Sequence, residues 1–249
     1  DLPTVMGTVT VFDPETGFAL AIMDGTHLTA MRTGAAGGVA AKYLARPDSR
    51  VAAFVGCGRQ AETQLAALMV TMPAVEQILA VDVDRSRAEK FAEAMTGEYG
   101  VTAHACDLDE ALSRADILTT VTPTRQPFVR CDTLKEGVHI NAIGADAPGK
   151  QELELDVLRS ARIVVDNWEQ ASHGGEINVA VSQGALEHDD IYADIGEIVT
   201  GKLPGRDEDT DITVFDSTGL AIQDCACAAH VWRALQDDVE NLPAVDFLD

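Results

Sequence analysis

A glycine-rich turn lies where an apolar strand is expected to pass into a helix. Its residues, Val55-Gly56-Cys57-Gly58-Arg59-Gln60-Ala61, match the pattern G-x-G-x-x-A. In such a turn Gly56 permits the tight bend, Gly58 lets the backbone approach a pyrophosphate, and Ala61 allows close helix packing. The N–H groups at the start of the helix bind the anion. The pattern therefore predicts a dinucleotide-binding turn.

An acidic residue, Asp82, ends the next expected strand 21 residues beyond Ala61. A carboxylate at this place binds the ribose hydroxyls of the adenosine half of a dinucleotide. It would also repel a 2′-phosphate, so Asp82 favours NAD over NADP. Arg85 and Arg87 are close in sequence and moderate that preference. NAD is therefore the expected cofactor.

A second polar segment, Asn141 to Lys150, follows a later strand and reads Asn-Ala-Ile-Gly-Ala-Asp-Ala-Pro-Gly-Lys. In doubly wound sheets ligands bind at the carboxyl edge, so Asp146 and Lys150 could serve proton transfer beside a nicotinamide. A plain turn capped by Asp146 fits the same spacing.

Two further features each allow a functional and a structural interpretation. Arg32, in an apolar helical stretch, either binds an anion or lies on a helix surface. The hydroxyls of 119–124 either face the cofactor or cap a turn.

These residues would be positioned by alternating strands and helices. The first thirty residues predict an antiparallel hairpin, with strands at 5–12 and 18–23, followed by a long helix over 28–45. Apolar strands separated by helices then predict a parallel sheet covered on both faces, an α/β fold of the Rossmann type. The predicted strands are 50–55, 78–81, 101–105, 117–121, 138–143, 163–165 and 212–215, and the predicted helices are 60–72, 86–95 and 220–235.

The composition excludes several classes of protein. A net charge of −23 would repel nucleic acid phosphates from most of the surface. No apolar run reaches the roughly eighteen residues that cross a bilayer, so no membrane partner is expected. Five cysteines in apolar stretches indicate reduced thiols in a cytoplasm. Cys225 and Cys227 have no second ligand pair nearby, so no metal site is expected.

The excess of acidic residues has two readings. The 41 acidic and 18 basic residues could simply form a solvated acidic surface. They could also reflect adaptation to a high-salt cytoplasm, where screening removes the cost of self-repulsion.

Taken together, these segments resemble the ornithine cyclodeaminase/mu-crystallin family. The matching segments are Leu2–Val5, Met23–Thr26, Leu28–Thr33, the Gly56 turn, Thr122–Thr124 and Gly144–Lys150. Segments 166–178 and 215–224 look most like the archaeal alanine dehydrogenase branch. The resemblance implies NAD-dependent oxidative deamination of L-alanine to pyruvate and ammonium. The alternatives are ornithine cyclodeamination to proline and a crystallin-like imine reductase or ligand-binding protein.

The resemblance also implies a subunit of two domains and a homodimer that acts on a small amino acid or keto acid. An NAD-binding Rossmann domain would cover 31–219. Part of a smaller α+β substrate and dimerisation domain would be built from 1–30 and 220–249. Asp146 would be the catalytic carboxylate. The residues that contact the dinucleotide would be Arg32, Arg59, Gln60, Asp82, Thr122 and Lys150. Thr4 and Ser217 would lie near the dinucleotide, and Gly56, Gly58 and Ile143 complete the predicted cofactor site.

The family carries a further stretch ahead of the segment that Leu2-Pro3-Thr4 resembles. By the resemblance, that stretch supplies an arginine that holds the substrate carboxylate and a lysine that takes part in proton transfer. The given sequence begins at Asp1 with neither. We therefore expect the chain to begin inside a longer protein.

Overall fold

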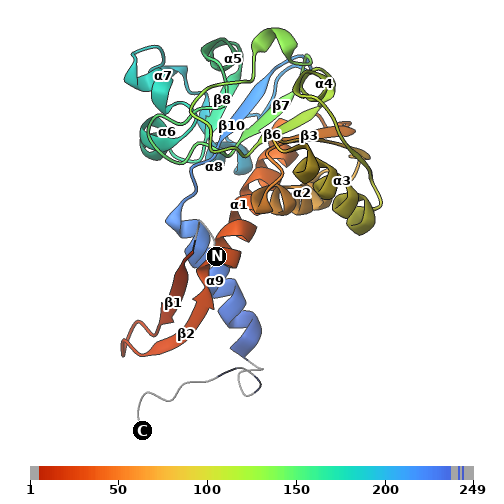
Figure 1. Ribbon diagram of the computed structural model, residues 1–249. Coiled ribbons are helices and arrows are strands. Elements are labelled where there is room, and N and C mark those ends of the chain that lie inside the picture. Colours follow the sequence, from red (N-terminus) through yellow and green to blue (C-terminus); the bar gives the residue numbers. More distant parts are fainter. Residues whose placement is uncertain (1–5, 237–240, 242, 244–249) are drawn as a thin grey trace. The chain divides into compact units, whose positions relative to one another are not determined.

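The computed structural model describes residues 6–236, 241 and 243, and these form two compact units (Figure 1). The larger unit comprises Thr33–Gly219. The smaller unit combines the described residues of the two chain ends, up to Arg32 and from Leu220 onward. The functions expected of the two domains stay predictions.

The larger unit is built on a sheet whose paired strands all run parallel (Figure 1). Its described strands lie in the order β5-β4-β3-β6-β7-β10-β8-β9. They are β3 (Val51–Val55), β4 (Gln77–Val81), β5 (Thr102–Ala105), β6 (Ile117–Thr120), β7 (His139–Ala142), β8 (Arg162–Val165), β9 (Ala193–Asp194) and β10 (Thr213–Asp216). The chain builds outward from β3 to β5 and then returns to β6 on the other side of β3. The doubly wound α/β prediction is confirmed, and a switch point lies between β3 and β6.

Helices cover both faces of this sheet because successive strand residues point to opposite sides. On one face, Phe54 and Ile78 pack against α2 (Arg59–Thr71) and α3 (Arg85–Tyr99). The part of α1 (Gly25–Leu44) that lies in the larger unit covers the same face, together with α8 (Ile195–Val199). The opposite face is covered by α4 (Leu108–Arg114), α5 (Leu155–Ser160), α6 (Trp168–Gly174) and α7 (Asn178–Ser182).

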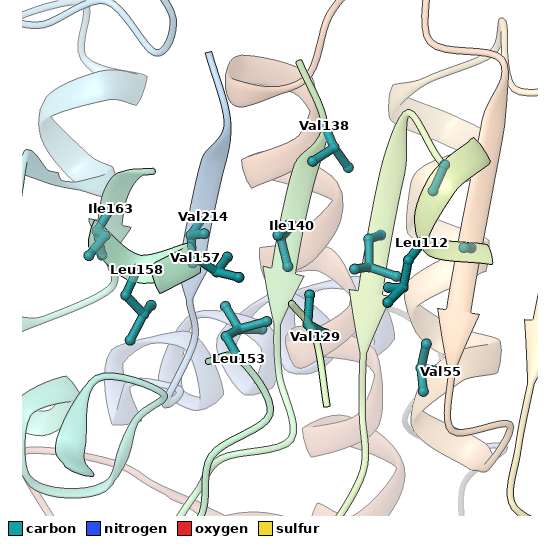
Figure 2. Packing of buried hydrophobic residues seen from close by; sticks show 14 of the residues in the cluster. Val55, Leu112, Val129, Val138, Ile140, Leu153, Val157, Leu158, Ile163 and Val214 are labelled. Carbon is teal, nitrogen blue, oxygen red and sulfur yellow. The ribbon is translucent and has the colours of Figure 1, made fainter. Parts of the chain in front are cut away.

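Figure 2 shows the buried side chains of the second face. Val55, Ile140 and Val214 come from β3, β7 and β10. They pack with Leu112 of α4 and Leu153, which precedes α5. This packing fixes the strands in register, so that the loops leaving their carboxyl ends begin at defined positions.

The smaller unit contains a hairpin and a helix. Strands β1 (Thr8–Phe12) and β2 (Ala19–Asp24) pair antiparallel, as predicted, and α9 covers Ala221–Leu235. Several apolar side chains of this unit are exposed, among them Phe12 at 58%, Ile22 at 63% and Ile222 at 70%. This unit thus presents apolar surface that its own described residues leave open.

The sequence patterns missed the short elements. Helices α4 to α8 have five to seven residues each and β9 has two, which is too short to show a helical or strand period. The longer elements start or end within a few residues of their predicted bounds. Across the described residues, no helix is both long enough and apolar enough to cross a membrane.

Candidate functional site

The glycine turn joins β3 to α2 at the carboxyl edge of the sheet. Gly56 has φ +94°, a left-handed conformation that side chains other than glycine rarely adopt. A Cβ there would lie 2.8 Å from the carbonyl oxygen of Val121, so only glycine lets the turn approach the loop after β6. A Cβ on Gly58, the N-cap of α2, would meet no described atom within 4 Å. The start of α2 therefore has open space in front of it.

Asp82 follows β4 and reaches back to this turn. Its Oδ2 accepts a hydrogen bond from the Cys57 N–H at 2.9 Å, and its Oδ1 accepts one from the Asp84 N–H at 2.9 Å. Burial, with the charge of Asp82 adding to it, raises the pKa of the Cys57 thiol to about 12. Cys57 is therefore a protonated, unreactive member of the turn.

Thr122 lies after β6, across the switch point from Gly56. Its N–H and its hydroxyl both donate to Oε1 of Glu152, each at 2.7 Å. Since the hydroxyl proton is used in this way, the Thr122 oxygen is left to accept a hydrogen bond from a ligand. Burial raises the pKa of Glu152, and the hydrogen bonds from Thr122 and Gly144 act against that rise.

The loop after β7 carries the predicted acid and base. Lys150 Nζ donates to Asp146 Oδ1 at 2.5 Å. The Asp146 side chain is 66% exposed and that of Lys150 is 21% exposed. The two predicted groups are thus brought together at a solvent-accessible place on the carboxyl edge.

The remaining predicted cofactor residues fall into two groups. Ile143 and Ser217 are buried after β7 and β10, and their N–H groups continue the sheet by donating to Thr120 and Ala142 carbonyls. The Ser217 hydroxyl is buried without a hydrogen-bond partner among the described residues. Arg59, which is exposed, and Gln60 begin α2. All these positions lie at one edge because parallel strands end on the same side.

Two other predicted residues do not belong to the described part of the larger unit. Thr4 lies outside the described residues. Arg32 belongs to the smaller unit, where its Nε donates to Asp224 Oδ1 at 3.1 Å. Its side chain is 15% exposed, so the anionic partner expected of a buried arginine is, in this structure, a carboxylate of the protein.

Sequence reasoning missed the buried acids behind these loops. Glu152, Glu176, Asp216 and Asp166 are all at most 5% exposed. Asp166 accepts from the N–H groups of Thr218 and Gly219, and Asp216 accepts from that of Ile177. The available signal was an aspartate that directly ends an apolar strand, as in Val164-Val165-Asp166.

This arrangement suits a specific kind of chemistry. The start of a helix and a glycine turn can hold a pyrophosphate, and a carboxylate at the next strand end can hold a ribose. On the far side of the switch point, an accessible carboxylate and ammonium pair can hold or move protons. In the described part of the chain, no group of three His, Cys, Asp or Glu residues could hold a metal ion.

A family model described as the ornithine cyclodeaminase/mu-crystallin family matches residues 1–238. The chain belongs to this family. Among curated members of the family, the alanine dehydrogenase of Archaeoglobus fulgidus is 53% identical over 93% of this chain and 71% of its own length. A Δ1-pyrroline-2-carboxylate reductase of Bacillus cereus is 36% identical over 92% of this chain and 71% of its own.

Solved structures of family members have the same fold. An archaeal alanine dehydrogenase dimer with bound NAD has a TM-score of 0.93 and 50% identity, over 99% of this chain and 76% of that one. The Thermococcus litoralis Δ1-pyrroline-2-carboxylate reductase, in complex with NADH and L-proline, has a TM-score of 0.91 and 38% identity, over 95% and 73%. The cofactor expected from the sequence is the one these relatives hold.

Proposed function

We propose that this protein binds NAD and catalyses the reversible oxidative deamination of L-alanine to pyruvate and ammonium. The observation that carries the proposal is the 53% identity to an archaeal alanine dehydrogenase over 93% of the chain. The position of Asp146 and Lys150 at the carboxyl edge of a doubly wound sheet supports it. The family includes members named for other reactions, so the substrate is part of the proposal.

The residues at the carboxyl edge fit NAD. The open space at Gly58 and the N–H groups of Arg59 and Gln60 would receive the pyrophosphate. Asp82 would bind the adenosine ribose while the hydrogen bond that it accepts from the Cys57 N–H holds the glycine turn. Thr122 would accept a hydrogen bond with an oxygen that Glu152 has already oriented. Ile143, Lys150 and Ser217 would be further residues of the cofactor site, together with Arg32 and Thr4.

The reaction would proceed at the amino-bearing carbon of alanine. NAD, when bound, supplies the acceptor for the hydride that leaves this carbon. Water then adds to the carbon of the resulting imine, and Asp146 takes a proton from that water. Lys150 keeps the carboxylate oriented through the ion pair seen here. Asp146 then returns the proton taken from water to the nitrogen, and ammonia leaves as the hydroxyl proton is released, which gives pyruvate and ammonium.

A second candidate is reduction of a cyclic imine, Δ1-pyrroline-2-carboxylate, to proline. It is favoured by the 38% identity to a solved reductase that holds NADH and L-proline. Ornithine cyclodeamination is the third, by the 35% identity to the Agrobacterium tumefaciens ornithine cyclodeaminase. All three reactions pass through an imine at the same carbon, so the site geometry does not separate them.

The test is to compare kcat/KM of the purified full-length protein for the three substrates. The proposal predicts steady NADH formation from L-alanine and NAD, with little turnover of the other two. Consumption of NADH with the cyclic imine as the preferred substrate would support the reductase. Proline formed from ornithine without net NADH would support the cyclodeaminase.

We further propose that the protein is a cytoplasmic homodimer and that the larger and smaller units of each subunit have different roles. The larger unit would bind NAD, and the smaller one would contribute to the substrate site and the dimer contact. The exposed Phe12, Ile22 and Ile222 offer an apolar surface that a second copy would cover. A solved relative is described as a dimer. The oligomeric state in solution, measured by light scattering, tests this proposal.

A further inference from the structure

Three buried side chains hold the loop between β7 and α5. Glu152, at the end of this loop, accepts from the Gly144 N–H at its beginning, with Oε2 at 3.0 Å. Glu176 Oε1 accepts from the N–H groups of Glu152 and Leu153, at 2.7 and 2.6 Å. Asn178 accepts from the Gly149 N–H at 2.8 Å. The loop that carries Asp146 is therefore fixed at its start, middle and end.

Glu152 also joins this loop to a second one. Its Oε1 accepts the two hydrogen bonds from Thr122, in the loop after β6, while its Oε2 accepts from Gly144. The side chain is fully buried, with 0% exposure. One carboxylate thus bridges the two loops that begin on the far side of the switch point from the glycine turn.

The bridge needs two acceptor oxygens. The backbone donors of Thr122 and Gly144 reach different oxygens of the same carboxylate, so an amide in its place would set an NH2 group against one of them. Packing at the bridge is equally specific. A Cβ on Gly144 would collide with the Thr122 carbonyl oxygen and lie 2.6 Å from Glu152 Oε2. Thr122, Gly144 and Glu152 therefore form one close-packed unit, which we call the loop clamp.

We propose that Glu152 is a positioning residue, whose carboxylate clamps the loop after β6 to the loop after β7 and so sets the place of Asp146 relative to Thr122. The proposal rests on the proposed function, in which Thr122 contacts the cofactor and Asp146 handles the proton. Gly144 is only two residues before Asp146. Release of its N–H would free the start of the loop, and small misplacements of reacting groups are costly in rate.

The test is Glu152→Gln in the full-length protein, with Glu93→Gln on the exposed surface of α3 as the matched control. The control should behave as the unmodified protein. With Glu152→Gln, NADH binding should weaken and turnover should fall by about 10- to 100-fold. Residue-resolved hydrogen exchange should show faster exchange at the amides of Thr122, Gly144 or both, while the amides of β3 and β4 stay protected.

A double-mutant cycle with Asp146→Asn separates positioning from general damage. If Glu152 acts through Asp146, Glu152→Gln should cost much less turnover when Asp146 is already Asn. An equal loss in both backgrounds would overturn the proposal, as would unchanged exchange at both clamp amides. If Glu152→Gln does not fold, Gly144→Ala opens the clamp from its other side and should give the same pattern.

Failure of the proposed function would be recognised separately. If the unmodified protein neither binds NADH nor oxidises alanine, the assigned chemistry is wrong. The exchange rates at Thr122 and Gly144 still report whether Glu152 joins the two loops. Slow exchange in the unmodified protein and fast exchange in Glu152→Gln would support the clamp, and equal rates would refute it.

Discussion

Asp146 and Lys150 are the residues on which the chemistry of the proposal depends. They are four positions apart in the sequence, the spacing of one helical turn, but they lie in a loop. The 2.5 Å contact between Lys150 Nζ and Asp146 Oδ1 therefore depends on the shape of that loop. That shape is set by side chains outside the pair, since Asn178 donates to the Lys150 carbonyl at 2.7 Å and Glu152 holds Gly144. An acid built only to cap a turn would not need an ammonium group held against it.

Replacing Asp146 by Asn should separate chemistry from binding. Asn is nearly isosteric and keeps hydrogen bonds but cannot exchange a proton at working pH. We expect turnover to fall on the order of 100-fold or more, with NADH affinity changed only a few-fold. Both are measured on one full-length preparation, with the exposed Asp109→Asn of α4 as control. Near-normal turnover, or loss of stability and NADH binding together, would contradict the catalytic role. Asp146 would then be the cap of a plain turn.

Cofactor preference should depend on Asp82. The neighbouring Val83 is fully exposed, and Arg87 is paired with Asp84. Replacing Asp82 by Ser and Val83 by Arg should shift the preference toward NADPH by about 1–3 kcal/mol, the scale of one charged contact. The ratio of NADPH to NADH affinity is the measurement. The substitution also removes the hydrogen bond from the Cys57 N–H, which loosens the turn. Because this weakens the affinities for NADH and NADPH alike, it cancels in their ratio. An unmodified protein that binds both equally would contradict this account.

At the scale of helices and strands, the sequence predicted the elements that show a hydrophobic period or contain a motif. The hairpin, the long helices and the strands β3 to β8 and β10 were predicted, because their apolar residues recur over five residues or more or are bounded by turn signals. The glycine turn and Asp82 were found by their spacing together with the strands and the helix expected around them. The structure puts Asp82 in contact with that turn.

The rest of the site could not be predicted because it depends on contacts between distant segments. Glu152 follows Lys150-Gln151 in an unremarkable polar stretch, and only folding brings it to Thr122, 30 residues earlier. Glu176 and Asp216 stand 40 residues apart, yet both are buried behind the same edge. An acid that will be buried cannot be distinguished in sequence from a solvated one unless an apolar strand runs directly into it.

The Asp216 carboxyl should leave a pH signature in stability. Burial raises its pKa from 3.8 to about 7. The folded protein therefore binds a proton that the unfolded chain has released, so this group's contribution is full below about pH 4 and is lost as pH rises toward 7. Each pKa unit corresponds to about 1.4 kcal/mol, which gives a change on the order of 4 kcal/mol.

The measurement is the free energy of unfolding of Asp216→Asn relative to the unmodified protein. The variant should gain relative stability as pH rises from about 4 to 7. Comparing the two proteins cancels the opposite slope expected of His139, whose pKa burial lowers to about 3. A difference that stays flat over this range would show that Asp216 titrates normally.

At the scale of the whole molecule, the charge of −23 is the dominant feature. If it reflects a high-salt cytoplasm, stability should rise as potassium chloride screens the repulsion among 41 acidic residues. Unfolding is followed by heating at increasing concentrations, up to several times the ionic strength of about 0.15 M at which the Debye length is about 8 Å. Sucrose at equal osmolality, which stabilises without screening, is the control. Maximal stability in dilute buffer would contradict adaptation to high salt, and the acidic residues would then form an ordinary solvated surface.

The central claim is that the protein turns over an amino acid and is more than a binder of NAD. The most direct measurement follows NADH and pyruvate together, by independent assays, in full-length protein given L-alanine and NAD. The account predicts equal amounts of both products, accumulating steadily to many times the amount of protein. Tight NADH binding with neither product exceeding the amount of protein would contradict it, and would assign the fold and its carboxyl-edge site to a ligand-binding role.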